Sequence, residues 1–342
     1  MNDGGGSIKT PVTLKDISER TGFTINTVSR ALKDKPDISE STVKLIKKAA
    51  KDMGYIGNSI AGALRSGLTN TIAVILGDIT NPHFSIMIKE IERVARTQKY
   101  TTFILNTDEN EELEEKAIMS ALAKMVDGII ICPTQKSSEN ILFLKKTNIP
   151  FVLIGRHFSD IDTDYVVCDD VNGGYLATKH LISIGHKRIL FLNGPLYISS
   201  AIERLEGYKK ACAEAKIPYE SDLVCEVSIT AGENWKTIKD IIESGIKFSA
   251  IVAFSDMIAW EMIHILDTYG YTMSSDYDIV GFDNIQSKLM FPINLTSVME
   301  SKIGMSQRAF KILLKKINKQ SVKPVKEIVS TQIIIRDSTA KK

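Results

Sequence analysis

The chain has 342 residues, a formal net charge of +2 and 44% hydrophobic residues, which is typical of a folded protein of two or three domains. No stretch approaches the roughly 18 consecutive apolar residues of a membrane-spanning helix, and residues 1–7 lack the apolar run of a secretory signal, so we expect a flexible leader and a cytoplasmic protein. The four cysteines are far apart and match no metal-ligand spacing, which indicates structural thiols.

The first predicted elements are two short helices joined by a tight turn. Their apolar residues recur three or four positions apart on either side of Gly22, where a helix must stop, and they are Leu14, Ile17, Val28 and Leu32. Thr24 is placed to cap the second helix. The next residues that fall away from the apolar face are free to contact bases, namely Ile25, Asn26, Ser29 and Arg30. This pattern predicts a helix-turn-helix whose second helix enters a DNA groove.

A third helix is expected over residues 41–53, with one apolar stripe and a lysine-rich remainder. Residues 8–66 contain 11 Lys and Arg against 6 Asp and Glu, an excess of five positive charges, although the whole chain carries only +2. The basic excess is therefore concentrated in one segment, as expected of a domain that binds DNA phosphates. An ordinary three-helix bundle with a solvated lysine face is the structural alternative.

From Thr71 onward, short runs rich in β-branched residues alternate with longer amphipathic stretches, which is typical of βαβ units on a parallel sheet. The predicted strands are 72–77, 101–106, 128–133, 151–155, 165–170, 188–194, 250–255 and 278–283. Two successive sets of such units predict two doubly wound α/β subdomains.

Open parallel sheets bind ligands at the carboxyl ends of their strands, so a cleft between two such sheets is a small-molecule site. Polar and aromatic residues that follow the predicted strands are the candidate contacts: Asn81, His83, Phe84, Asn106, Asp108, Arg156, Ser255, Asp256 and Asp283. No GxSxG, P-loop, GxGxxG or HExxH motif is present, so we expect neither an enzyme nor a cofactor. His83, His180 and His186 have no cysteine or carboxylate at metal-ligand spacing, so we expect surface or loop roles and no metal.

Several segments in a fixed order resemble the lactose-repressor (LacI/GalR) family of bacterial transcription regulators. They are TLKDISERTGFTINTVSRAL at 13–32, NSIAGALRSGLTNTIAVI at 58–75, DITNPHFS at 78–85, DDVNGGYLATKHLISIGHKRILFLNG at 169–194, RLEGY at 204–208, IVGFDN at 279–284, LTSV at 295–298 and IIIRDST at 333–339. The resemblance covers nearly all of residues 8–340 and is far more specific than a lone helix-turn-helix.

The resemblance implies a leader, a DNA-binding domain, a hinge helix with its linker, and a core that binds effector and dimerises. The expected bounds are 1–7, 8–57, 58–69 and 70–342 in that order. Within the core, the fold of a periplasmic binding protein implies an N-subdomain at about 70–167 and 299–329, and a C-subdomain at about 168–298 and 330–342.

The recognition-helix residues Ile25 and Asn26 match the pair that reads bases in the major groove in this family. An asparagine can pair bidentately with adenine, and an isoleucine can contact a thymine methyl group. The remaining headpiece residues expected at the DNA are Thr13, Thr24, Thr27, Ser29 and Arg30.

Residues 58–65 match the family's hinge helix, which orders on DNA and lies in the minor groove. Leu64 matches the leucine that wedges between base pairs, and Asn58 and Ala61 are further expected contacts. Gly57 and Gly62 replace a common proline and a common longer polar residue, so we expect a hinge helix of lower stability off DNA.

In the core, Arg204 and Asp283 match charged residues that bind a sugar or a purine in this family, and a structural salt bridge is the alternative for them. Ser255 replaces a frequent asparagine, and Phe84 matches an apolar wall. Asn106, Asp108 and Arg156 complete the expected effector site.

These features imply a homodimeric repressor of carbohydrate-utilisation genes that binds a near-palindromic operator under control of a sugar or sugar derivative. Control by a purine or nucleoside, or by a phosphocarrier protein, is the alternative, and a free sugar-binding protein is a more distant one. A terminal leucine heptad is absent, so we do not expect a tetramer.

Overall fold

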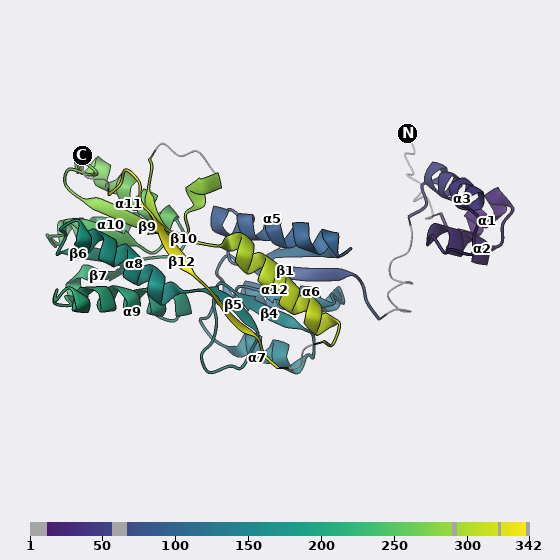
Figure 1. Cartoon of the computed structure of the whole chain (residues 1–342), viewed down its shortest axis with the longest axis horizontal. Coiled ribbons are helices and arrows are strands. Elements are labelled where there is room, and N and C mark those ends of the chain that lie inside the picture. The colour runs from purple at the N-terminus through teal and green to yellow at the C-terminus, as the bar shows by residue number, and fades with distance from the viewer. Residues whose placement is uncertain (1–11, 57–66, 289–292, 321–322, 340–342) are drawn as a thin grey trace, which may run out of the picture. The chain divides into compact units, whose positions relative to one another are not determined.

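We describe a computed structural model, which defines residues 12–56, 67–288, 293–320 and 323–339 (Figure 1). The chain divides into two compact units, Met1–Thr69 and Asn70–Lys342, and each is described by itself. The expected leader and the hinge residues Asn58, Ala61 and Leu64 lie outside the described residues. No helix in the described ranges is long and apolar enough to cross a membrane.

The first unit contains the three predicted helices, α1 (Leu14–Thr21), α2 (Ile25–Leu32) and α3 (Glu40–Met53). They close around a small core of buried apolar side chains, Ile17, Val28, Ala31, Ile46 and Ala50. Gly22 ends α1 with a φ of 73°, a left-handed conformation that a glycine adopts at little cost. The predicted cap of α2 is confirmed, because the Thr24 hydroxyl accepts a hydrogen bond from the Thr27 amide at 3.1 Å.

The second unit contains two six-stranded sheets. The first has the order β11-β5-β4-β3-β1-β2 and is parallel throughout. Its strands are β1 (Thr71–Leu76), β2 (Thr101–Asn106), β3 (Gly128–Ile131), β4 (Phe151–Ile154), β5 (Tyr165–Cys168) and β11 (Lys326–Val329). Strands β1, β3 and β4 are almost wholly buried because helices cover both faces of the sheet.

The second sheet has the order β12-β10-β9-β8-β6-β7, in which only β12 runs antiparallel to its neighbour among the described strands. Its strands are β6 (Ile189–Asn193), β7 (Val224–Glu226), β8 (Ala250–Ala253), β9 (Asp278–Phe282), β10 (Thr296–Glu300) and β12 (Thr331–Ile334). The eight strands predicted from sequence are all present, and β7, β10, β11 and β12 are additional. The predicted fold class of two doubly wound α/β subdomains is confirmed.

Helices pack on each sheet and define the two subdomains. The first subdomain has α5 (Pro82–Thr97), α6 (Glu111–Ala123), α7 (Glu139–Lys146) and α12 (Lys302–Ile317). The second has α8 (Asp170–Ser183), α9 (Ser199–Glu214), α10 (Trp235–Glu243) and α11 (Asp256–Thr268), with the short turns η1 (Ser221–Leu223) and η2 (Ile285–Lys288). Figure 1 shows α5 and α12 side by side on the first sheet and α8 beside α9 on the second.

The chain crosses between the two sheets after β5, after β10 and after β11. Residues at two of these crossovers carry buried charges, namely Asp170 after β5, and Glu300 and Lys302 on either side of the second. The crossovers are where any rotation of one subdomain against the other must be accommodated.

Candidate DNA-binding surface and effector cavity

The second helix of the headpiece presents its predicted base-reading side chains to solvent. Ile25 is 48% exposed and Asn26 is exposed, whereas Thr27 and Ser29 are half-buried. An exposed isoleucine at the start of a capped helix has no packing role in the described headpiece, which suits contact with a base edge.

Three of the expected DNA contacts have structural duties as well. Thr13 forms a reciprocal capping box with Asp16, and Thr24 caps α2. Arg30 forms an ion pair with Asp37 at 2.7 Å. Both side chains are exposed, so the pair has little desolvation cost. Arg30 therefore has a competing partner that DNA phosphate would have to replace.

A cavity of about 60 Å³ lies where the carboxyl ends of the two sheets meet. The first subdomain lines it from the ends of β3, β4 and β5 and the segments after β1 and β2. The second lines it from the ends of β8, β9 and β10, the segment after β7 and the start of α9. Seven predicted contacts line this cavity, namely Asn81, His83, Phe84, Arg156, Arg204, Ser255 and Asp283. Further lining residues that sequence reasoning did not assign to an effector are Glu109, Cys132, Gly155, Cys168, Ser200, Ile229, Phe254 and Glu300.

Arg204 on α9 lies at the centre of this site. Its Nε donates to Asp170 at 2.6 Å, its Nη1 donates to the Phe254 carbonyl, and its guanidinium carbon lies 3.5 Å from the centre of the Phe282 ring. The salt bridge that the sequence left as an alternative is thus formed. Burial raises the pKa of Asp170 to about 6 despite the opposing effect of Arg204, so this carboxylate is ionised at neutral pH.

Arg156, after β4, forms the equivalent pair in the first subdomain. Its Nη1 donates to Glu109 at 2.7 Å and to the Pro133 carbonyl at 2.9 Å, and its Nη2 donates to Glu109 at 3.0 Å. Burial lowers the pKa of Arg156, but the Glu109 carboxylate outweighs it and gives a net rise. Both cavity arginines therefore already bind carboxylates of their own subdomain.

Three expected contacts do not line the cavity. Asp256 is buried and accepts hydrogen bonds from the Ser297 hydroxyl and the Ile285 amide. Asn106 and Asp108 are exposed and bond to each other, and the Asn106 Oδ1 accepts a hydrogen bond from the Ile79 amide at 2.8 Å. They fix the turn between β1 and α5, and the neighbouring Glu109 takes the place at the cavity instead. The structure therefore does not place Asn106 and Asp108 at the cavity, and their contact with an effector stays a prediction.

Phe84 and Ser255 lie where the sequence placed them. Phe84 is 7% exposed and meets the His83 ring edge-on, with ring centres 5.0 Å apart. Ser255 is buried and caps α11 by accepting a hydrogen bond from the Ile258 amide at 3.2 Å. Asp283, next along the rim, has a φ of 97°, a strained backbone conformation of the kind that persists at binding sites.

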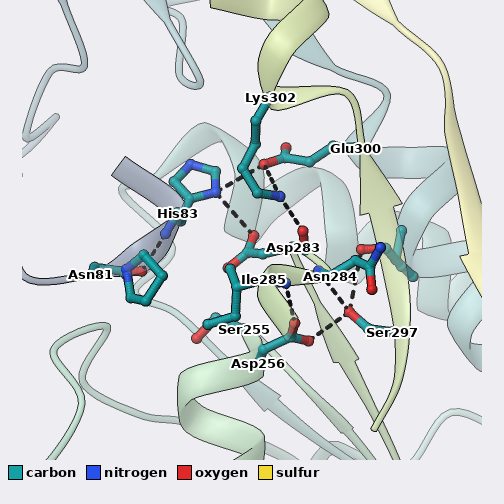
Figure 2. Close-up of polar contacts among 12 residues, drawn as sticks. Asn81, His83, Ser255, Asp256, Asp283, Asn284, Ile285, Ser297, Glu300 and Lys302 are labelled. Carbon is teal, nitrogen blue, oxygen red and sulfur yellow. Dashed lines mark hydrogen bonds and ion pairs between the residues drawn. The ribbon is translucent and has the colours of Figure 1, made fainter. Parts of the chain in front are cut away.

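His83 departs from the surface or loop role expected of it. Its Nδ1 lies 2.9 Å from Glu300 Oε1 and 3.4 Å from Asp283 Oδ1, and its side chain is only 14% exposed (Figure 2). Burial lowers the pKa of His83, but Glu300 and Asp283 outweigh it and raise the pKa to about 9. The ring is therefore cationic at neutral pH. His180 and His186 make ordinary structural hydrogen bonds, with Thr339 and with Ser249 and Asp278.

Within the described residues, His83, Asp283 and Glu300 form the single cluster whose spacing could suit a metal ion. Two features oppose this. A metal ion would have to displace the proton that the raised pKa of His83 favours, and the Lys302 ammonium, which lies 3.5 Å from Glu300, would repel it. We conclude that the cluster is a set of buried ion pairs.

Comparison with known proteins gives the family. Residues 69–337 match the family model for periplasmic binding proteins and the sugar binding domain of the LacI family, and residues 13–58 match that for bacterial regulatory proteins of the lacI family. Catabolite control protein A of Priestia megaterium is 31% identical over 91% of this chain and 94% of its own. The HTH-type transcriptional repressor PurR of Actinobacillus pleuropneumoniae serotype 3 (strain JL03) is 29% identical over 95% of this chain and 98% of its own.

A crystal structure of the lac repressor dimer bound to operator and the anti-inducer ONPF has the same fold, with a TM-score of 0.84 at 23% identity over 96% of this chain and 99% of that one. The headpiece, the two-sheet core and these matches agree with one another. The chain therefore belongs to the LacI family of bacterial regulatory proteins and is a DNA-binding transcriptional regulator.

Proposed function

We propose that this protein is a cytoplasmic repressor that binds a near-palindromic operator as a homodimer, under control of an uncharged, hydroxyl-rich effector such as a sugar. The observation that carries the proposal is the cavity between the two subdomains, which polar and aromatic side chains from both sheets line. A ligand there touches both subdomains at once, so it can favour one arrangement of the core over another.

The DNA side of the proposal rests on the headpiece. Ile25 and Asn26 read bases, and Thr13, Thr24, Thr27, Ser29 and Arg30 hold the helix on the duplex. Asn58, Ala61 and Leu64 keep their proposed minor-groove roles from the family resemblance. A homodimer places two such headpieces on two half-sites of the operator. The two weak half-site contacts together then give tight, specific binding.

The charges around the cavity indicate an uncharged effector. Arg156 is bonded to Glu109, Arg204 to Asp170, and His83 to Glu300 and Asp283, and Lys302 lies beside Glu300. A phosphate or carboxylate would have to displace one of these carboxylates, which would then remain buried without its partner at a cost of several kcal/mol. Hydroxyl groups can bond to the same side chains without displacing any charge.

A thermal-shift screen tests the proposal. Purified protein is heated with matched pairs of neutral and phosphorylated sugars, and with polyols and nucleobases. A binder at 100 times its dissociation constant adds about 2.7 kcal/mol of stability. We expect a neutral sugar to raise the melting temperature, and we expect the shift to disappear in Asp283→Asn but persist in Glu243→Gln, a surface variant on α10.

A hit among phosphorylated sugars alone would contradict the uncharged effector, and a hit among nucleobases would favour the purine alternative. Silence across the panel would favour control by a protein. One observation favours this second candidate. Arg308, Lys311 and Lys315 form a basic stripe along a groove on α12. A phosphocarrier protein carrying an anionic group would suit this stripe, and its binding is testable by titration against Lys311→Glu.

A further inference from the structure

The turn between α2 and α3 carries an acidic residue, Asp37, that binds Arg30 of the recognition helix α2. Arg30 Nε donates to Asp37 Oδ2 at 2.7 Å, and Arg30 Nη2 lies 2.7 Å from the same oxygen. Both donors lie on one side of the planar guanidinium. Asp37 therefore occupies the side edge of Arg30 and leaves the end edge, which Nη1 and the second N–H of Nη2 form.

The backbone of the turn holds Asp37 in place. The Arg30 carbonyl accepts hydrogen bonds from the Lys33 and Lys35 amides, both at 3.1 Å, so the turn folds back on the end of α2. The Ile38 amide donates to the Lys35 carbonyl at 3.2 Å, and the Ile38 side chain packs against the headpiece core. The position of the Asp37 carboxylate beside Arg30 therefore does not depend on the ion pair alone.

Arg30 lies one helical turn after Asn26, which is proposed to read a base. Residues four positions apart share one face of a helix, and both side chains are exposed. The two positions are about 6 Å apart along the helix axis, which corresponds to about two base-pair steps of DNA. Arg30 therefore belongs to the face of α2 that is proposed to enter the groove.

The remaining donors of Arg30 suit a guanine better than a phosphate. Two parallel N–H groups match O6 and N7 on the major-groove edge of guanine, which is the commonest specific contact of an arginine. A phosphate bound to Arg30 would come close to the Asp37 carboxylate and be repelled by it. Because both partners are exposed, the ion pair contributes little to folding, and its effect is on the orientation of the guanidinium.

We infer that Asp37 is a positioning residue that makes Arg30 a reader of guanine instead of a phosphate contact. The inference rests on the proposed DNA-binding function and refines the part that Arg30 has in it. Asp37 touches no base; its carboxylate fixes the guanidinium and disfavours a phosphate beside it. Each half-site of the operator should then contain a guanine about two base pairs from the base that Asn26 reads.

A second ion pair of the headpiece provides a matched control. Lys47 Nζ on α3 lies 2.6 Å from Asp34, which belongs to the same turn as Asp37 and is also exposed. Asp34 has a φ of 50°, a conformation that asparagine also adopts. Asp37→Asn and Asp34→Asn therefore each remove one negative charge from this turn with little change in shape, but only Asp37→Asn frees Arg30.

In vitro selection from random DNA tests the inference, because it requires no known operator. The full-length parent and each variant receive the same library, and the base preference at every position of the selected sites is compared. Asp37→Asn should lower the preference for one guanine in each half-site by about threefold or more, with the other positions unchanged. Arg30→Lys keeps the charge but loses the paired N–H geometry, so its loss should fall on the same position. Asp34→Asn should select the parent sites.

Fluorescence anisotropy then measures binding to the selected site and to its guanine-to-adenine counterpart at constant salt. Asp37→Asn and Asp34→Asn should strengthen binding to random DNA equally, since each removes one negative charge. A parent site without this guanine, or parent-like preferences in Asp37→Asn or Arg30→Lys, would overturn the inference, as would a loss spread evenly over all positions. A parent protein that selects no sequence at all would refute the proposed function, and the inference with it.

Discussion

Arg204 and Asp170 form a buried ion pair, 2.6 Å from Nε to Oδ1, that lies wholly within the second subdomain and beside its first crossover. The arginine expected to bind the effector thus already has a carboxylate partner, and we expect ligand hydroxyls to bind to the pair as a unit. A substitution of Arg204 therefore affects the stability of the fold as well as the cavity.

We expect Arg204→Ala to lower the free energy of unfolding by about 3–5 kcal/mol, because it leaves a buried carboxylate without its partner. Urea denaturation followed by circular dichroism measures the loss. Arg204→Met combined with Asp170→Asn removes both charges and should recover most of it. If Arg204→Ala alone lowered the free energy of unfolding by less than about 1 kcal/mol, the pair would contribute little to stability.

The charge on His83 gives the stability a pH dependence. The folded pKa of about 9 lies above the ordinary value of 6.5, so the stabilisation is complete below pH 6.5 and is lost as the pH rises through 9. Its upper limit is about 3 kcal/mol. We expect the difference in unfolding free energy between the parent and His83→Asn to shrink across that range. A difference that stays constant with pH would contradict the raised pKa of His83.

We predict that Glu109 disfavours anionic effectors on the first-subdomain side of the cavity. Replacing it by glutamine keeps the side-chain shape but releases the Arg156 guanidinium. We expect Glu109→Gln to favour a sugar phosphate over the matching neutral sugar by about tenfold relative to the parent, or about 1.4 kcal/mol. Calorimetric titration with both ligands measures the ratio, and Glu139→Gln on α7 is a control outside the cavity. An unchanged ratio would exclude Glu109 as a selectivity residue.

Operator binding should be strongly dependent on salt, since each phosphate neutralised contributes a slope of about −0.9 in log affinity against log salt. Asn26→Ala should weaken specific binding by about 1–3 kcal/mol while leaving this slope unchanged. Leu64→Ala should weaken binding to the operator more than binding to random DNA. Fluorescence anisotropy over a salt series checks all three, and equal losses of Leu64→Ala on both DNAs would refute the wedge role.

Sequence periodicity was sufficient for most of the fold. The eight predicted strands are rich in β-branched residues and mostly buried, whereas β7 has only three residues and β11 is a partly exposed edge strand with Lys326 and Glu327. Such short or half-polar strands form because a neighbouring strand offers hydrogen bonds, and their own sequences carry little signal.

The cavity was predictable in place but not in detail. The carboxyl-end rule located Phe84, Arg156, Ser255 and Asp283, because it depends only on strand direction. The rule could not tell whether Asn106 or Glu109 lines the cavity. The answer depends on which side chain the turn after β2 directs inward. Glu300 is the last residue of β10, a strand that was not predicted, so this partner of His83 had no signal in the sequence.

The most direct test of control by a cavity ligand is reciprocal. Operator affinity is measured with and without the ligand found in the screen, and ligand affinity with and without operator. Because coupling between two sites is mutual, we predict the same fold-change in both measurements, and its loss in Asp283→Asn. A ligand that binds the cavity while leaving operator affinity unchanged would contradict regulation through this site.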